Sequence, residues 1–165
     1  MYKLAQLLYL MAPAYLANMA PPFVKYWKGP NPPISRRWLG AHKTVGGFAL
    51  GIAVAVAAAG LQRALDWEGA LVSYERWPLI GLALGFGALA GDALKSLVKR
   101  RLGIAPGEPW MPADQLDFVA GALVFAAPFA GLDVRDVVLI AALSFAGDLA
   151  VNQLAFRLGI RDAPL

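Results

Sequence analysis

Four side chains that can bind phosphate or a metal ion recur at helical spacing within a long apolar segment. They are Asp92, Lys95, Ser96 and Lys99, at relative positions 0, 3, 4 and 7. Residues three, four and seven apart lie on one face of an α-helix, so these side chains should point in one direction. Charged residues within a membrane are costly and usually face the protein interior or a wet cavity. In the simplest structural interpretation, Asp92 and Lys95 only pair with each other.

Two further carboxylates, Asp114 and Asp117, begin the next apolar segment and lie one helical turn apart. Helix capping by Asp114 and a favourable dipole interaction of Asp117 would explain them locally. That explanation does not account for three carboxylates close to a group of cations. Mg²⁺ takes hard oxygen ligands, often one or two carboxylates with substrate phosphates and water, and nearby cations neutralise phosphate oxygens. The pattern predicts a metal-assisted phosphate site with Asp92, Asp114 and Asp117 as the metal ligands.

Further basic residues and glycines flank these segments. Lys43 precedes Gly46 and Gly47 at the start of another apolar run, where glycine lets backbone N–H groups approach an anion closely. A packing role for the two glycines is the alternative. A second basic group can either bind phosphate or anchor a helix at the membrane surface, and it comprises Lys99, Arg100 and Arg101. The chain has no Walker A sequence, which excludes a P-loop nucleotide site.

Composition places these residues in a membrane protein. Of 165 residues, 59% are hydrophobic, above the 45–50% or so that is typical of soluble domains. A spanning helix needs about 20 mostly apolar residues. The sequence predicts an all-α polytopic membrane protein of one domain, residues 1–165, with five transmembrane helices near Leu4–Val24, Thr44–Gln62, Trp77–Gly91, Phe118–Leu132 and Val137–Phe156. The third reaches spanning length only if it includes Asp92 and Lys95.

The absence of cysteine excludes thiolate metal sites, and the presence of a single histidine argues against a Ser-His-Asp triad.

The distribution of lysine and arginine predicts the orientation of these helices. Eleven of the fifteen basic residues fall in the segments after the first, third and fifth predicted helices. Since cytoplasmic loops carry the excess of basic residues, the N-terminus should lie outside, the C-terminus in the cytoplasm, and the phosphate site at the cytoplasmic face of the cell membrane.

A composite motif gives this pattern a family resemblance. Five elements together resemble the signature of CTP-dependent membrane cytidylyltransferases: Gly91-Asp92, Lys95-Ser96, Lys99-Arg100, Gly103-Ile104 and Pro112-x-Asp114-Gln115-x-Asp117. Within that superfamily, the small size and three further elements resemble the CDP-archaeol synthase family: Asn18-x-x-Pro21-Pro22, Lys43-x-x-Gly46-Gly47 and the terminal Leu158-Gly159-Ile160-Arg161-Asp162-x-Pro164. The resemblance spans nearly the whole chain. A more polar motif would be expected around Gly147-Asp148 and Asn152, so the roles of Asp148 and Asn152 stay undecided.

The resemblance implies Mg²⁺-dependent transfer of CMP from CTP to digeranylgeranylglyceryl phosphate, an unsaturated archaeal ether lipid phosphate, giving CDP-archaeol and pyrophosphate. It implies catalytic roles for Asp92, Lys95 and Asp117. It also implies substrate-binding roles for Asn18, Pro21, Lys43, Gly46, Gly47, Ser96, Lys99, Arg100 and Arg101. The partners expected are CTP, the lipid phosphate and the bilayer, with no nucleic acid; the oligomeric state is left open.

Three alternatives stay open at this stage. A CDP-alcohol phosphotransferase would require Gly after the Asp-x-x-Asp pair, where this chain has Phe118. A small transporter or lipid-binding scaffold could use Asp92 and Asp148 as a cation site. The same chemistry could act on a diacyl phosphatidate. A separation of Asp92 and Asp114 beyond about 12 Å would exclude one shared Mg²⁺ site at normal ligand distances.

Overall fold

The computed structural model describes residues 2–105 and 108–157 of the chain. Its α-helices are α1 (Tyr2–Met19), α2 (Val45–Leu65), α3 (Trp77–Arg101), α4 (Ala113–Ala126) and α5 (Val134–Arg157), with two 3-10 helices, η1 (Pro21–Tyr26) and η2 (Tyr74–Arg76). The described residues form no β-strand, and one isolated bridge joins Pro33 to Thr44. The predicted all-α class is confirmed. The terminal motif from Leu158 to Pro164 lies outside the described residues.

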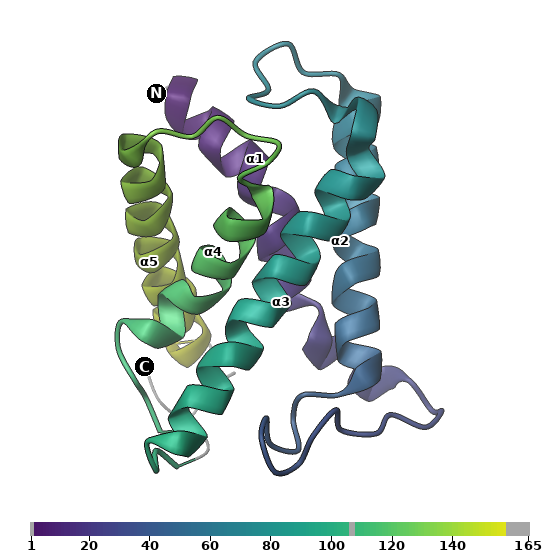
Figure 1. Ribbon diagram of the computed structural model, residues 1–165, viewed down its shortest axis with the longest axis vertical. Coiled ribbons are helices and arrows are strands. Elements are labelled where there is room, and N and C mark those ends of the chain that lie inside the picture. Colours follow the sequence, from purple (N-terminus) through teal and green to yellow (C-terminus); the bar gives the residue numbers. More distant parts are fainter. Residues whose placement is uncertain (1, 106–107, 158–165) are drawn as a thin grey trace.

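The helices run alternately up and down, so that both long connections with many basic residues meet at one end of the bundle (Figure 1). The connection between η1 and α2 and the described part of the connection between α3 and α4 lie at the lower end of that view. The connections between α2 and α3 and between α4 and α5 lie at the upper end. This arrangement agrees with the pairing of basic loops expected from the sequence, while the side of the membrane stays a prediction.

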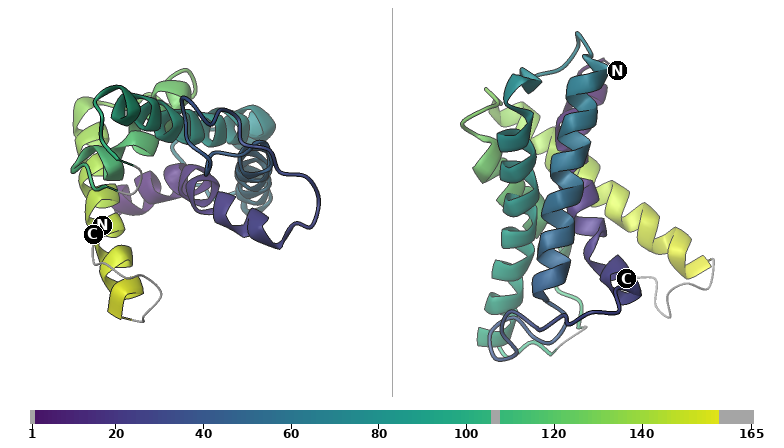
Figure 2. Two further views of the ribbon diagram at one scale, coloured as in Figure 1. Left: turned by 90° about the horizontal axis from the view of Figure 1, so that it is seen from below. Right: turned by 90° about the vertical axis from the view of Figure 1, so that its right-hand side faces the viewer.

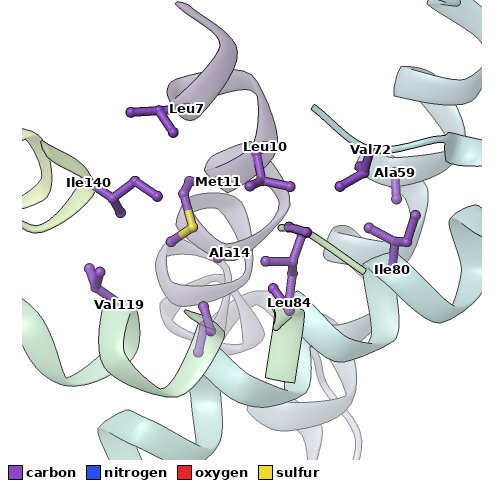
Figure 3. Close-up of a cluster of buried hydrophobic side chains, with 14 of the residues drawn as sticks. Leu7, Leu10, Met11, Ala14, Ala59, Val72, Ile80, Leu84, Val119 and Ile140 are labelled. Carbon is purple, nitrogen blue, oxygen red and sulfur yellow. The ribbon is translucent and has the colours of Figure 1, made fainter. Parts of the chain in front are cut away.

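Helix α1 lies at the centre and supplies several of the largest buried side chains. Four of its buried side chains recur at intervals of three, one and three residues, so that they form one stripe along the helix: Leu7, Leu10, Met11 and Ala14. Figure 3 shows this stripe facing residues of all four other helices. The buried side chains that meet it include Ala59, Ile80, Leu84, Val119 and Ile140. Burial of these groups fixes the order of the helices around α1.

Four helices are long and apolar enough to cross a membrane, in the part of the chain that the structure describes. They cover Tyr2–Tyr26, Val45–Leu65, Tyr74–Arg101 and Val134–Leu154. The expected fourth span differs: α4 has 14 residues and ends at Ala126, close to Pro128, which cannot continue a helix. At a rise of 1.5 Å per residue, α4 is about 21 Å long, shorter than the roughly 30 Å of hydrocarbon in a bilayer. The predicted count of five spans is therefore not confirmed.

Helices α3 and α4 approach each other more closely than side chains would allow. A Cβ atom built on Gly91 would lie 2.1 Å from the carbonyl oxygen of Asp117, and one built on Gly121 would lie 2.1 Å from that of Gly87. Small residues permit such close packing of membrane helices. The contact places the charged turn of α3 beside the acidic first turns of α4.

Candidate active site

The ammonium group of Lys95 lies among the three predicted carboxylates. Its Nζ atom is 2.8 Å from Asp117 Oδ2, 3.0 Å from Asp114 Oδ1 and 3.4 Å from Asp92 Oδ1. Because each oxygen is within 3.4 Å of one nitrogen, any two of them are less than about 7 Å apart. The separation that would have excluded a shared site is thus not present. Lys95 is only 16% exposed, so this charge cluster is largely shielded from solvent.

Two further lysines complete the charge cluster. Lys43 forms a close ion pair with Asp92, which links the start of α2 to α3. Lys99 Nζ lies 3.2 Å from both carboxylate oxygens of Asp114 and also donates to the carbonyl of Glu108. Lys99 is buried, contrary to what a surface anchor would require. Three ammonium groups thus lie against three carboxylates in this cluster.

Asp114 is held in its charged form by these contacts. Burial alone would raise its pKa, but the backbone N–H of Trp110, which donates to Oδ2 at 2.6 Å, and the ammonium groups of Lys95 and Lys99 lower the pKa below its ordinary value. The first turn of α4 receives no side-chain cap from Pro112, the residue before it. The carboxylate therefore contacts the cations and the preceding loop, and does not act as an ordinary helix cap.

Two polar cavities adjoin the cluster and share Lys43 and Asp92. The first, of about 360 Å³, lies between α3, α4 and α5 and is lined among others by Ser96, Lys99, Arg100 and Asp114. The second, of about 330 Å³, lies between the end of α1, η1 and the start of α2, and is lined among others by Asn18, Pro21, His42 and Gly47. The cavities place most of the predicted substrate-binding residues around one charge cluster.

The glycine pair at the start of α2 has protein partners in this structure. The N–H of Gly46 donates to Asn31 Oδ1 at 3.0 Å, and the N–H of Gly47 donates to Thr44 Oγ1 at 3.2 Å. A Cβ on Gly47 would also lie 3.3 Å from Pro21 Cβ. These contacts favour packing and capping for the pair, and phosphate binding by either amide would require it to exchange partners.

The remaining predicted residues divide between the cavity and the surface. Ser96 Oγ donates to the carbonyl of Asp92 at 2.9 Å, and Arg100 Nη1 donates to the carbonyl of Ile104 at 2.9 Å. Arg101 is exposed, and its guanidinium carbon lies 5.7 Å from the ring centre of Trp38. Such a contact suits an interfacial anchor. The structure thus does not bring Arg101 to the charge cluster.

Three residues with no role assigned from the sequence also line the first cavity. Asp148 and Asn152 of α5 face it, and Asn152 Nδ2 donates to Asp148 Oδ2 at 2.8 Å. Gln115 is 6% exposed, and its Oε1 atom has no hydrogen-bond partner among the described residues. In the sequence, the dipeptide Gly91-Asp92 of α3 recurs as Gly147-Asp148 in α5, and this repeat could have indicated that α5 contributes to the site. Gln115 lies between Asp114 and Asp117 in the motif, and that position could have indicated that its side chain belongs to the site.

Comparison with known proteins places this arrangement in a family. A family model described as CarS-like: CDP-archaeol synthase matches residues 1–165. The chain belongs to the CDP-archaeol synthase family. The CDP-archaeol synthase of Thermofilum pendens is 37% identical over 166 residues, covering 92% of this chain and 76% of that protein. That of Methanococcus aeolicus is 42% identical over 86 residues, covering 52% of this chain and 48% of that protein, about half its length.

A solved structure extends the comparison to the fold. It is described as "Structural insight into an intramembrane enzyme for archaeal membrane lipids biosynthesis", and it shares a TM-score of 0.74 and 34% sequence identity with this chain. The match covers 88% of this chain and 91% of that one. The CDP-archaeol synthase family comprises CTP-dependent cytidylyltransferases, so this chain is an enzyme and a multi-pass membrane protein. The transporter, scaffold and CDP-alcohol phosphotransferase alternatives are therefore set aside.

Proposed function

We propose that the chain transfers CMP from CTP to digeranylgeranylglyceryl phosphate, forming CDP-archaeol and releasing pyrophosphate, at the cytoplasmic face of the membrane. The observation that carries the proposal is the convergence of Asp92, Asp114 and Asp117 on Lys95 beside two polar cavities. Membership of the CDP-archaeol synthase family supports the reaction class.

The charges of the cluster suit a metal-bound triphosphate. With three lysines paired to three aspartates, the cluster has little net charge left to offset the phosphates of CTP and of the lipid. No three His, Cys, Asp or Glu side chains are arranged to hold a metal by themselves within the described ranges. Mg²⁺, however, commonly needs only one or two carboxylates when substrate phosphates supply the other ligands. Asp92, Asp114 and Asp117 fit that requirement, and Mg²⁺ bound there would offset phosphate charge.

The lysines would exchange their carboxylate partners for phosphate oxygens when substrates bind. Lys43 lines both polar cavities, and Lys95 and Lys99 line the first. A lipid phosphate oxygen forms a bond to the α-phosphorus of CTP while the bond from that phosphorus to the bridging oxygen breaks, and pyrophosphate leaves with the electron pair. A phosphate monoester is already ionised near neutral pH, so the step requires no general base. Positioning and charge stabilisation by the lysines supply the rate enhancement.

A labelled-nucleotide assay on the purified protein tests this function. The protein in detergent is given CTP labelled in the α-phosphate, Mg²⁺ and digeranylgeranylglyceryl phosphate, with and without EDTA. We expect label to enter the lipid, pyrophosphate to be released, and EDTA to stop both. A parallel reaction with a diacyl phosphatidate measures the preference between ether and ester lipids. Folded protein that transfers no label to either lipid contradicts the proposal.

A further inference from the structure

We propose that an apolar groove on the outer side of α3 and α4 binds one hydrocarbon chain of the lipid substrate and leads its phosphate to Lys95. This assignment rests on the proposed function and specifies where its second substrate lies. The groove has a volume of about 540 Å³ and is separate from the two polar cavities. Its walls include Ala90, Leu94 and Val98 of α3 and Ala120, Val124 and Phe125 of α4.

The groove is apolar along its walls and charged at a single place. Lys95 and Asp117 are the charged side chains among its lining residues, and both belong to the charge cluster. Lys95 also lines the first polar cavity. A molecule lying in the groove with an anionic head would therefore present that head to the same ammonium group that lines the first polar cavity.

The length of the groove matches the length of a lipid hydrocarbon chain in one leaflet of the bilayer. Its lining residues on α4 run from Ala113 to Phe125, which is about 18 Å along a helix. Half of the hydrocarbon thickness of a bilayer is about 15 Å. The groove also begins at the end of the bundle that carries the basic loops (Figure 1). A lipid of that leaflet can enter it sideways with its head at the level of the cluster.

A second apolar cavity, of about 260 Å³, competes for this assignment. It lies between α1, α4 and α5, where the C-terminal half of α5 diverges from the bundle (Figure 2), and it is lined by residues including Leu8, Leu143 and Val151. The charged side chain that lines it is Asp148, a carboxylate. The groove of α3 and α4 also contains a carboxylate, Asp117, but of the two cavities it is the one that offers an ammonium group. An anionic lipid head is attracted by an ammonium group and repelled by a carboxylate, so the charges favour the groove of α3 and α4.

Bulky substitutions in the groove test the assignment. Leu94 and Val124 are 63% and 70% exposed, so Leu94→Trp and Val124→Trp fill the groove without disturbing the core. Two matched controls are Leu8→Trp in the second apolar cavity and Leu82→Trp, an exposed residue of α3 outside the groove. We expect each groove variant to raise the KM for the lipid phosphate at least fivefold, with the KM for CTP unchanged. Both controls should behave as wild type.

A crosslinking measurement on the unsubstituted protein makes the result independent of how the variants fold. A lipid phosphate with a photoreactive group in its chain should label α3 or α4 within the groove, as read by peptide mass spectrometry. Labelling concentrated on α1 and α5, or a raised lipid KM in Leu8→Trp alone, overturns the assignment in favour of the second cavity. In a parallel reaction with a bifunctional protein crosslinker, protein-protein crosslinks across the groove, together with no lipid label there, overturn it in favour of a second copy of the chain. A wild-type protein that forms no CDP-lipid instead contradicts the proposed function.

Discussion

The ammonium group of Lys95 is the common neighbour of the three acidic side chains. Replacing it by Lys95→Ala should lower kcat/KM for CTP by about 100-fold or more, the usual scale for losing one charged donor to a transition state. Asp92 and Asp114 keep Lys43 and Lys99 as partners, while the buried Asp117 loses its ammonium partner, so we expect a folded variant with a lowered melting temperature. The assay of label transfer and thermal unfolding in detergent measure both properties. Lys28→Ala, which changes an exposed lysine, is the charge control, and equal losses in both variants would indicate a nonspecific charge effect.

The side chain of Gln115 leads to a different expectation, because its Oε1 atom is buried and has no hydrogen-bond partner in the part of the chain that the structure describes. An unsatisfied buried polar group costs about 1–3 kcal/mol. Gln115→Leu should therefore keep or raise the melting temperature while lowering kcat/KM at least tenfold, if the amide serves substrate. A variant with wild-type kinetics would show that the amide has no part in binding or catalysis.

At the scale of elements, the close approach of α3 and α4 positions the cluster. Gly121→Ala places a methyl group against the carbonyl oxygen of Gly87, so the helices must separate. We expect a loss of about 1–3 kcal/mol in stability, the usual cost of overpacking, together with reduced turnover. Gly131→Ala, where a Cβ would meet nothing within 4 Å, is the matched control. Unaltered stability and turnover in Gly121→Ala would show that the contact is not required.

Helical spacing predicted which side chains of the charge cluster share a helix face, but not which side chains of other helices they contact. The positions of Asp92 and Lys95 on one helix face, and the start of the next helix near Asp114, followed from the sequence. The burial of Lys99 did not, because a basic run at a helix end looks the same whether it meets solvent or a carboxylate from another helix. The C-terminal end of α4 was placed too late, at Leu132, since apolar residues continue past Ala126 although Pro128 prevents the helix from continuing.

At the scale of the whole molecule, the orientation in the membrane can be tested directly because the chain contains no cysteine. The substitutions Lys28→Cys and Glu68→Cys introduce single cysteines at exposed positions of the η1–α2 and α2–α3 connections. These two connections lie at opposite ends of the bundle (Figure 1). In intact cells, a membrane-impermeant maleimide should label the cysteine at position 68, and the cysteine at position 28 only after permeabilisation. The reverse pattern would place the active site on the outer face.

The shortness of α4 has a mechanical consequence for the surrounding bilayer. A helix of about 21 Å beside four longer ones creates hydrophobic mismatch on one flank, and a bilayer responds to mismatch by thinning locally. The flank concerned is the one that carries the groove between α3 and α4. Lipid head groups there would lie deeper than in the rest of the leaflet. The protein would thus shorten the distance that a lipid phosphate must travel to reach the level of Lys95.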